Sequence, residues 1–281
     1  IKTNVIMVST MTTRDADVTI LAMERGAVDF VTKPTNIIEA KGDAFRKEIL
    51  GILNAVLKTE RISLTERRPA VAAVSAVQKR NASAETRFKN KIVALACSTG
   101  GPKALQSVIP YLPANLDAPM VLVQHMPAGF TNSMANRLDE ISKIHVKEAE
   151  NGEILKKGTV YIAPGGKHME VKKCPDGSHK IVYNDMPPIG GLKPCANITY
   201  DSLRTCGYDQ VVCVVLTGMG ADGTNGILEL SKVKPIYTIA QDAQTCVVYG
   251  MPKAIAETGL VNEVVPLTEV ANSITKNVGV N

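Results

Sequence analysis

The sequence contains no tryptophan, and aromatic residues make up only 4% of its 281 positions. Its formal net charge is +5, and the basic residues do not gather in a stripe interleaved with aromatic side chains. Surfaces that bind nucleic acids usually combine these two features. The sequence therefore argues against a nucleic-acid partner, whereas its mildly basic balance is compatible with an acidic protein substrate.

Long hydrophobic runs are also missing. No apolar stretch in the sequence approaches the roughly 20 residues that a membrane-spanning helix requires. The chain starts at Ile1, without the basic, apolar and small residues of a secretory leader. With 45% hydrophobic and 21% charged residues, its composition is typical of a soluble globular protein. We expect a fragment of a cytoplasmic protein that does not insert into a membrane.

Paired cysteine motifs are absent as well. The six cysteines form no CxxC pair, and several lie inside apolar runs, where cysteine behaves as a small hydrophobic residue. The four histidines show no metal-ligand spacing with the cysteines or with each other. We therefore expect reduced thiols, no metal and no cofactor. The cysteines are Cys97, Cys174, Cys195, Cys206, Cys213 and Cys246.

The first 60 residues carry the pattern of part of an α/β domain. Residues 5–9 and 28–32 are predicted to be buried strands, and an amphipathic helix is predicted over about residues 15–25, ended by Gly26. Two buried strands joined by a helix indicate a parallel sheet. A second helix is predicted over about residues 37–60. Its expected apolar face consists of Phe45, Ile49, Ile52, Leu53 and Val56.

The remainder of the chain divides into a linker and a larger domain. Residues 61–90 are rich in charge, alanine and serine, which predicts a linker, with a surface helix as the alternative. Over residues 91–281, strand-like runs alternate with helical patterns such as PKALQSVIPYL. The middle, which includes GTVYIAPGGKHMEVKK and SHKIVYN, is expected to be rich in hairpins, and the C-terminal tail is expected to be helical. This predicts an α/β fold: a doubly wound, mostly parallel, Rossmann-like sheet with an antiparallel hairpin, preceded by the partial α/β domain of residues 1–60.

Polar residues follow three of the predicted buried strands. Ser98 comes after IVALA, His125 after MVLVQ, and Asp222 after VVCVVLT and a glycine-broken loop. Because the carboxyl ends of neighbouring parallel strands line one crevice, we expect these residues to meet. A serine nucleophile, an imidazole base and a carboxylate that orients the imidazole form a catalytic triad. Gly100 and Gly101 would free backbone N–H groups to meet a developing oxyanion.

Simpler interpretations of the same residues remain open. The Ser-Thr-Gly-Gly turn before a helix could cap that helix or cradle a phosphate. His125 alone could be structural, and Asp222 followed by Gly223 could be a turn. The turn is not the G-x-S-x-G elbow of α/β hydrolases, because Ala96 occupies the position of the first glycine.

Other histidines and acids are weaker candidates. His168 is expected either in a structural hydrogen bond or in the cleft, and His145 and His179 are expected at the surface. Four other acids could orient the histidine, but none follows a buried strand through a glycine-rich loop. They are Asp185, Asp201, Asp209 and Asp242.

Four segments together carry a family resemblance. The chain contains, in this order, CSTGGPKAL, QHMPAGFT, APGGKHMEV and LTGMGADGTNG. In these segments it resembles the CheB family, the protein-glutamate methylesterases of bacterial chemotaxis. The resemblance implies hydrolysis of glutamate γ-methyl esters on the cytoplasmic domains of methyl-accepting chemoreceptors, and in some members deamidation of receptor glutamines. It implies Ser98 as nucleophile, His125 as base and Asp222 as orienting acid, with Thr99 and Met219 on the oxyanion and substrate side.

The N-terminal segment MVSTMTTRDADVTILAMERGAVDFVTKP resembles the second half of a response-regulator receiver domain, with its flavodoxin-like α/β fold. Ser9 and Lys33 match the hydroxyl and the lysine that read the phosphoryl group, and Phe30 matches the switch aromatic. The resemblance implies a histidine kinase as a partner of the intact protein. The phosphoacceptor aspartate would lie before residue 1, so we expect no switching of this chain by phosphorylation. We also expect this remnant to be loosely held or paired with something else.

One segment departs from the family pattern. Where the family commonly shows His-Arg/Lys-Pro-Ser-x-Asp, residues 192–197 of this chain are LKPCAN, so that Leu192 replaces a cleft histidine, and Cys195 and Asn197 stand where the family has Ser and Asp. Two alternative functions follow. The chain could be a catalytically weak homologue that binds receptors, or an anion-binding or nucleotide-binding α/β module that uses STGGP as its cradle.

Overall fold

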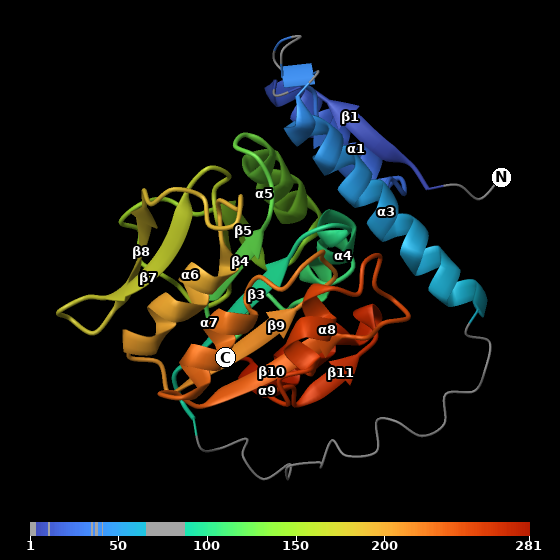
Figure 1. The fold of residues 1–281 in the computed structure, drawn as a ribbon. Helices are drawn as coiled ribbons and strands as arrows, with labels where there is room; N and C mark the ends of the chain where they lie inside the picture. The colour runs from blue at the N-terminus through green and yellow to red at the C-terminus, as the bar shows by residue number, and fades with distance from the viewer. Residues whose placement is uncertain (1–3, 11, 35, 37–38, 41, 66–87) are drawn as a thin grey trace.

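The computed structural model describes residues 4–10, 12–34, 36, 39–40, 42–65 and 88–281 (Figure 1). Most of the region predicted to be a linker, residues 66–87, lies outside this part, as do residues 37–38 at the expected start of the second helix. No helix among the described residues has both the length and the apolar character needed to cross a membrane.

A seven-stranded sheet forms the centre of the larger domain, and every neighbouring pair of strands in it is parallel. In spatial order its strands are β11 (Glu263–Val265), β10 (Ile236–Gln241), β9 (Gln210–Val215), β3 (Lys91–Cys97), β4 (Met120–Gln124), β6 (Thr159–Ile162) and β5 (His145–Glu148). Starting from β3, the chain first adds β4, β5 and β6 on one side and then adds β9, β10 and β11 on the other. This confirms the predicted doubly wound α/β fold, with its switch point at β3.

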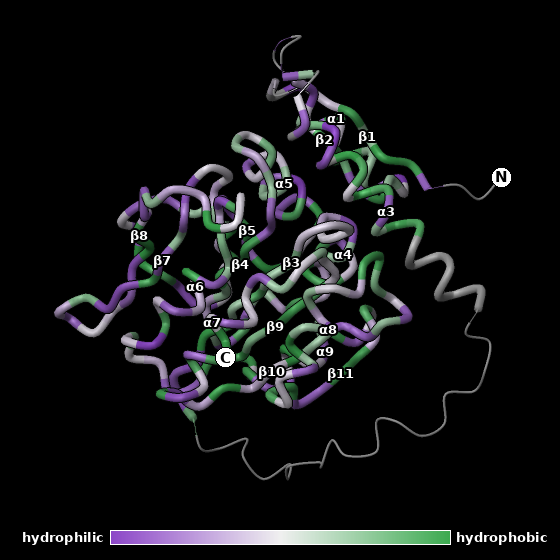
Figure 2. The backbone as a smooth tube through the Cα atoms, viewed as in Figure 1, coloured by the Kyte–Doolittle hydropathy of each residue, from purple (hydrophilic) through white to green (hydrophobic). Residues whose placement is uncertain are grey.

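Helices cover both faces of this sheet. On one face lie α4 (Gly101–Gln106), α5 (Phe130–Ile141) and α9 (Val270–Val278). On the other lie α6 (Ala196–Ser202), α7 (Thr224–Ser231), α8 (Met251–Ala256) and the antiparallel hairpin of β7 (His168–Lys173) and β8 (His179–Asn184). Because both faces are covered, the central strands β3, β4 and β9 consist mostly of buried apolar residues, with polar residues at their ends (Figure 2).

Several local predictions need correction. The segment TVYI was expected in the hairpin-rich middle, but it is β6 of the parallel sheet. The helix expected over PKALQSVIPYL is divided into α4 and the 3₁₀ helix η1 (Ile109–Tyr111), since Pro110 cannot continue α4. The C-terminal region, expected to be helical, contains the short edge strand β11 between α8 and the 3₁₀ helix η3 (Leu267–Glu269). A further 3₁₀ helix, η2 (Leu203–Thr205), follows α6.

The N-terminal unit contains the predicted strand, helix, strand and helix, but the first strand, predicted to be buried, exposes Val8 at 46%. These elements are β1 (Ile6–Ser9), α1 (Thr13–Glu24), β2 (Asp29–Thr32) and α3 (Asp43–Thr65), with β1 and β2 paired in parallel. The Thr12 side chain caps α1, and Gly26, at φ +111°, follows its end. Helix α3 runs into the first residues of the expected linker.

The N-terminal unit packs against the larger domain through α1, which lies beside α4 and α5 (Figure 1). Ile20 and Met23 of α1 belong to the same buried cluster as the residues under α4 and α5. The Phe30 ring stacks on Phe130 with 4.5 Å between centroids. The guanidinium of Arg137 pairs with Glu24 at 2.9 Å. The N-terminal unit, expected to be loosely held or paired with something else, thus shares a buried core with the larger domain.

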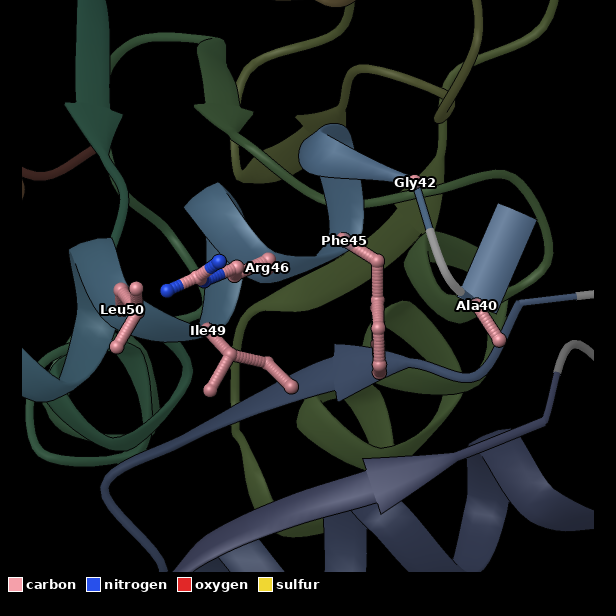
Figure 3. Close-up of a pocket in the computed structure, with 6 residues that line it drawn as sticks. All are labelled: Ala40, Gly42, Phe45, Arg46, Ile49 and Leu50. Atoms are coloured by element: carbon pink, nitrogen blue, oxygen red, sulfur yellow. The ribbon is translucent and has the colours of Figure 1, made fainter. Parts of the chain in front are cut away.

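The buried face of α3 is narrower than predicted. Ile52 and Val56 are buried against Val28 and Val31, whereas Leu53 is 40% exposed and lies off this face. Successive residues are about 100° apart around a helix, so Leu53 falls at the edge of the stripe formed by the other four apolar residues. Figure 3 shows Phe45 and Ile49 pointing from α3 toward the two-stranded sheet, in a pocket lined by residues of α3 and of the segment just before it. Its other lining residues are Ala40, Gly42, Arg46 and Leu50.

The packing of Phe30 predicts a large loss of stability when its ring is removed. Phe30→Ala is expected to lower the free energy of unfolding by about 3–5 kcal/mol, because the ring is buried against Phe130. Urea denaturation measures this difference. Val18→Ala on α1 is the control, since Val18 is 54% exposed and should change stability by less than about 0.5 kcal/mol. Equal losses in the two variants would contradict the shared core.

Candidate active site

Three adjacent strands end at the candidate site. β3 lies between β4 and β9, and Ser98, His125 and Asp222 follow these strands at their carboxyl ends. The main chain links the three strand ends, because the N–H of Ser98 donates to the carbonyl of Thr217 at 3.0 Å and the N–H of His125 donates to the carbonyl of Cys97 at 3.2 Å. The site therefore occupies the switch point of the sheet, where α/β proteins bind ligands.

His125 and Asp222 are joined by a hydrogen bond. Nε2 of His125 lies 2.7 Å from Oδ2 of Asp222, and the side chains are 9% and 5% exposed. An ionised carboxylate can only accept hydrogen bonds, so the shared proton belongs to Nε2 of the imidazole. The neutral ring then carries its basic lone pair on Nδ1. Of the five aspartates considered from the sequence, Asp222 is the one joined to His125.

A ring of donors holds Asp222. Besides His125, the carboxylate accepts the N–H groups of Ala196 at 2.6 Å, Asn197 at 3.0 Å and Gly223 at 2.9 Å. The thiol of Cys195 donates to Oδ1 at 3.1 Å. Burial alone would raise the pKa of Asp222, but the hydrogen bond and positive charge of His125, with the donors at Ala196 and Cys195, lower it to about 2. Asp222 is therefore a carboxylate throughout the neutral range.

Asn197 fixes the loop that carries Asp222. Its side-chain oxygen accepts the N–H groups of Gly223 at 3.1 Å and Gly226 at 2.8 Å, two of the backbone donors at the start of α7. A Cβ on Gly226 would lie 2.8 Å from the carbonyl oxygen of Asn197, so α6 and α7 approach closely here. Asn197, which departs from the family pattern, therefore has a structural role in this chain: its side chain holds the start of α7.

Ser98 begins the turn between β3 and α4. Gly100 adopts φ +76°, and a Cβ there would lie 2.6 Å from Cβ of Val247, so the turn needs glycine at this position. Among the described residues, no hydrogen bond joins the Ser98 hydroxyl to His125. Nucleophile–base contacts are often long in unliganded enzymes and tighten when substrate binds. The structure thus places Ser98 and His125 at neighbouring strand ends, without a direct side-chain bond between them.

Thr99 and Met219 differ in how far they are exposed to solvent. Thr99 is buried, and its carbonyl accepts the hydroxyl of Thr217 at 3.0 Å. Met219 is 50% exposed. A Cβ on Gly51 of α3 would lie 3.8 Å from Cε of Met219, and Val247 packs against the apolar cluster of α3. Helix α3 therefore lies against two of the loops near Ser98.

The remaining histidines lie elsewhere. His145 is exposed and bonds Asp139 at 2.9 Å, as expected for the surface. His179 was expected at the surface but is 6% exposed: it stacks on Tyr208 and accepts the N–H of Gly207 at 2.8 Å. Burial, with nearby lysines, lowers the pKa of His179. His168 is fully buried and its Nε2 lies 3.2 Å from the carbonyl oxygen of Pro187, which gives it the structural hydrogen bond that was one of its two expected roles.

The alternative acids have other partners. Asp185 pairs with Lys167 at 2.7 Å and Asp201 with Arg204 at 2.9 Å. Asp209 accepts the N–H groups of Lys89 and Asn90, and Asp242 accepts the N–H of Thr245. All six cysteines are free thiols. Within the described ranges, no group of three or more His, Cys, Asp or Glu side chains is arranged to hold a metal ion.

Ser9 and Lys33 lie together at one end of the two-stranded sheet. The N–H of Lys33 donates to the carbonyl of Ser9 at 2.6 Å, and the Ser9 hydroxyl accepts that of Thr19 at 2.7 Å. Ser9 is buried and Lys33 is exposed. Their side chains belong to the N-terminal unit and do not contribute to the Ser98 site.

Two contributors to the site were not identified from the sequence. Gln124, the last residue of β4, hydrogen-bonds to the main chain of Ser98 and His125. Cys195 was noted only as a departure, whereas its thiol contacts Asp222. A polar residue at the buried end of the MVLVQ strand was the available signal for Gln124. No local pattern points to Cys195, because its partner lies 27 residues away.

Known proteins match this chain along nearly its whole length. A protein-glutamate methylesterase/protein-glutamine glutaminase of Symbiobacterium thermophilum is 40% identical over 99% of this chain and 77% of its own length. A protein of the same description from Pyrococcus horikoshii is 43% identical over 98% of this chain and 73% of its own length.

A solved structure and a family comparison point the same way. The crystal structure of the Thermotoga maritima CheB methylesterase catalytic domain is 42% identical in sequence and superposes with a TM-score of 0.63, over 66% of this chain and 97% of that one. Residues 93–274 match the family described as CheB methylesterase. With this match across the larger domain and relatives of such identity, the chain belongs to the CheB methylesterase family.

Proposed function

We propose that this chain hydrolyses glutamate γ-methyl esters on the cytoplasmic domains of chemoreceptors to glutamate and methanol, and deamidates receptor glutamines at the same site. The relatives are named for both activities. The hydrogen bond of 2.7 Å between His125 and Asp222, at the strand end beside Ser98, is the observation that carries the proposal. An anion cradle formed by the Ser-Thr-Gly-Gly turn would have no use for this buried histidine–carboxylate pair.

The proposed mechanism assigns one role to each side chain. Oγ of Ser98 attacks the ester carbonyl carbon while Nδ1 of His125 takes its proton. Asp222 holds the ring in the tautomer that leaves Nδ1 basic, and its charge stabilises the imidazolium. The imidazolium then protonates the departing methoxide, which leaves as methanol. Water gives a proton to His125 and attacks the acyl-enzyme carbonyl. The tetrahedral intermediate then expels Oγ of Ser98, which takes that proton back from His125, and glutamate is released. With a glutamine substrate the same sequence releases ammonia.

The oxyanion and domain assignments are part of the same proposal. Backbone N–H groups near Thr99 and Met219 would stabilise the oxyanion of the tetrahedral intermediate. We assign residues 91–281 as the catalytic domain and residues 1–60 as part of a receiver domain that, in a longer protein, would respond to a histidine kinase. Ser9 and Lys33 would serve phosphoryl recognition there.

The test is methanol release from a methylated chemoreceptor cytoplasmic fragment. We expect one methanol for each glutamate formed, and ammonia from the same fragment with glutamine at the modified positions. Mild alkaline hydrolysis of a parallel sample shows that methyl esters are present. If alkali releases methanol and the chain does not, the esterase proposal fails and a receptor-binding role is favoured.

Cys195 provides a prediction about how Asp222 is held. Burial, followed by the charge of Asp222, raises the pKa of Cys195 to about 12, so its thiol is protonated and donates at neutral pH. Cys195→Ala should lower kcat about fivefold, the equivalent of one hydrogen bond of about 1 kcal/mol. Cys195→Ser should restore kcat, because a hydroxyl donates more strongly than a thiol.

The control for this prediction is Cys206→Ala. Cys206 is also buried, but its sulfur lies 3.3 Å from the carbonyl oxygen of Val171, outside the contacts of Asp222. Steady-state kinetics of methanol release should show no change in kcat for this variant. A loss in Cys206→Ala equal to that in Cys195→Ala would indicate a general packing effect instead.

A further inference from the structure

One buried amide connects the main chains of Ser98 and His125. Nε2 of Gln124 donates to the carbonyl of Ser98 at 3.1 Å and to the carbonyl of His125 at 2.9 Å. Oε1 of the same amide accepts the thiol of Cys97 at 3.0 Å. Gln124 is only 2% exposed, so both N–H groups and the oxygen find their partners within the protein.

These partners fix the orientation of the amide. If the amide were flipped, its oxygen would face the two carbonyl oxygens, which cannot donate to it. Its NH₂ group would then face the Cys97 thiol, and sulfur is a weaker acceptor than a carbonyl oxygen. Burial raises the pKa of Cys97 far above its usual value, so the thiol keeps its proton and remains a donor to Oε1. The contacts therefore require an amide here, and a carboxylate of the same shape would not satisfy them.

The surrounding sequence makes room for this side chain. A Cβ on Gly101 would lie 1.9 Å from Oε1 of Gln124 and 3.1 Å from Sγ of Cys97. The glycine at the start of α4 is thus needed to admit the Gln124 side chain beneath the Ser98 turn. The second glycine of the Ser-Thr-Gly-Gly turn serves this contact, in addition to any role in exposing backbone N–H groups.

We propose that Gln124 is a positioning residue that sets the spacing of the nucleophile Ser98 and the base His125, an inference that rests on the proposed esterase function. β3 and β4 are paired up to Cys97 and Gln124, and ladder pairing ends there. Ser98 and His125 are the first residues beyond the paired strands. Beyond the end of the paired strands, the side-chain amide of Gln124 links the two strand ends instead. Its Nε2 donates one hydrogen bond to the carbonyl of Ser98 and one to the carbonyl of His125.

Gln124→Glu and Gln124→Met test this role. Glu keeps the shape but replaces the NH₂ donor with an oxygen, and Met removes both polar groups at similar volume. Since a misplacement of about 1 Å between reacting groups costs up to about 100-fold in rate, we expect kcat to fall roughly 10- to 100-fold with little change in KM. Ile239→Val is the control, because it removes a methyl group from the buried middle of β10 away from the strand ends.

Amide hydrogen exchange measured by NMR provides a second readout that needs no turnover. In both Gln124 variants, exchange should accelerate at Ser98 and His125, whose N–H groups are bonded to Thr217 and Cys97. Exchange at Val93 and Val121, inside the paired strands, should keep its parental rate. A purely structural role would instead raise exchange throughout the sheet and lower Tm as Ile239→Val does.

The possible outcomes separate the two proposals. A fall in kcat at constant KM with local acceleration of exchange supports the positioning role. Unchanged kcat in Gln124→Glu, or exchange that rises uniformly, overturns it. If the parent chain releases no methanol, the esterase proposal fails by itself, and the exchange pattern still decides whether Gln124 fixes the two strand ends.

Discussion

Ser98→Ala is expected to abolish methanol release from methylated chemoreceptor fragments, with kcat falling roughly 10⁴–10⁶-fold. The variant lacks the oxygen that would form the acyl-enzyme, and His125 has no proton to accept from an alanine side chain. The surface of this chain that binds the receptor fragment is otherwise unchanged, so binding of the fragment should persist. Methanol release and fragment binding, measured on the same preparation, separate these two effects.

Ser107→Ala is the matched control for this substitution. Ser107 follows α4 and its hydroxyl donates to the carbonyl of Lys103 at 3.4 Å, so the same kind of atom is removed at the opposite end of α4 from Ser98. Its kcat should equal that of the parent chain. If Ser98→Ala retained substantial turnover, another nucleophile or direct attack by water would have to replace the proposed acyl-enzyme.

Asp222→Asn should reduce kcat by roughly 10⁴-fold while leaving the fold intact. The carboxylate accepts from five donors: His125, Cys195 and the N–H groups of Ala196, Asn197 and Gly223. An asparagine amide has only one acceptor oxygen, and its NH₂ group must then face a donor. If that NH₂ group faces His125, the ring takes the other tautomer, Nδ1 carries the proton, and the base is lost.

Asp201→Asn is the control for Asp222→Asn. Asp201 is exposed and forms a surface ion pair with Arg204, so its neutralisation should leave kcat unchanged. The measurement is kcat for methanol release, with circular dichroism to verify the fold. Activity near that of the parent in Asp222→Asn would mean that His125 keeps its tautomer without the carboxylate.

The low pKa of Asp222 also links it to stability in acid. Its pKa falls from the usual 3.8 to about 2 on folding, which corresponds to roughly 2 kcal/mol of stabilisation. Because the folded-state pKa is the lower one, this contribution is complete above about pH 4 and is lost as the pH falls toward 2. Urea denaturation at pH 6 and pH 2 should therefore show the difference between the parent chain and Asp222→Asn shrinking in acid.

Much of the fold could be predicted because its strands are short, apolar and locally distinct. β4 and β9 follow the runs MVLVQ and VVCVVLT closely, since strands buried on both faces need continuous apolar sequence. β6 was misplaced because TVYI reads equally well as a hairpin strand or as a parallel strand. The buried face of α3 was predicted too wide, since hydrophobicity alone does not show that Leu53 is largely exposed.

The sequence by itself determined that the candidate residues lie at the carboxyl ends of buried strands. Each of Ser98, His125 and Asp222 follows a run whose local composition marks a buried strand, and parallel strands bring their carboxyl ends to one edge. Its four segments also carried the family resemblance. These features are local in the chain, so they can be read without knowing the order of the strands.

Only the tertiary structure decided which groups touch. His125 and Asp222 are 97 residues apart, Cys195 reaches Asp222 across the start of α6, and Gln124 joins two turns through a space that Gly101 leaves open. The packing of Phe30 on Phe130 was equally invisible in the sequence. Such contacts depend on strand order and on which neighbour offers a donor within about 3 Å, and local composition encodes neither.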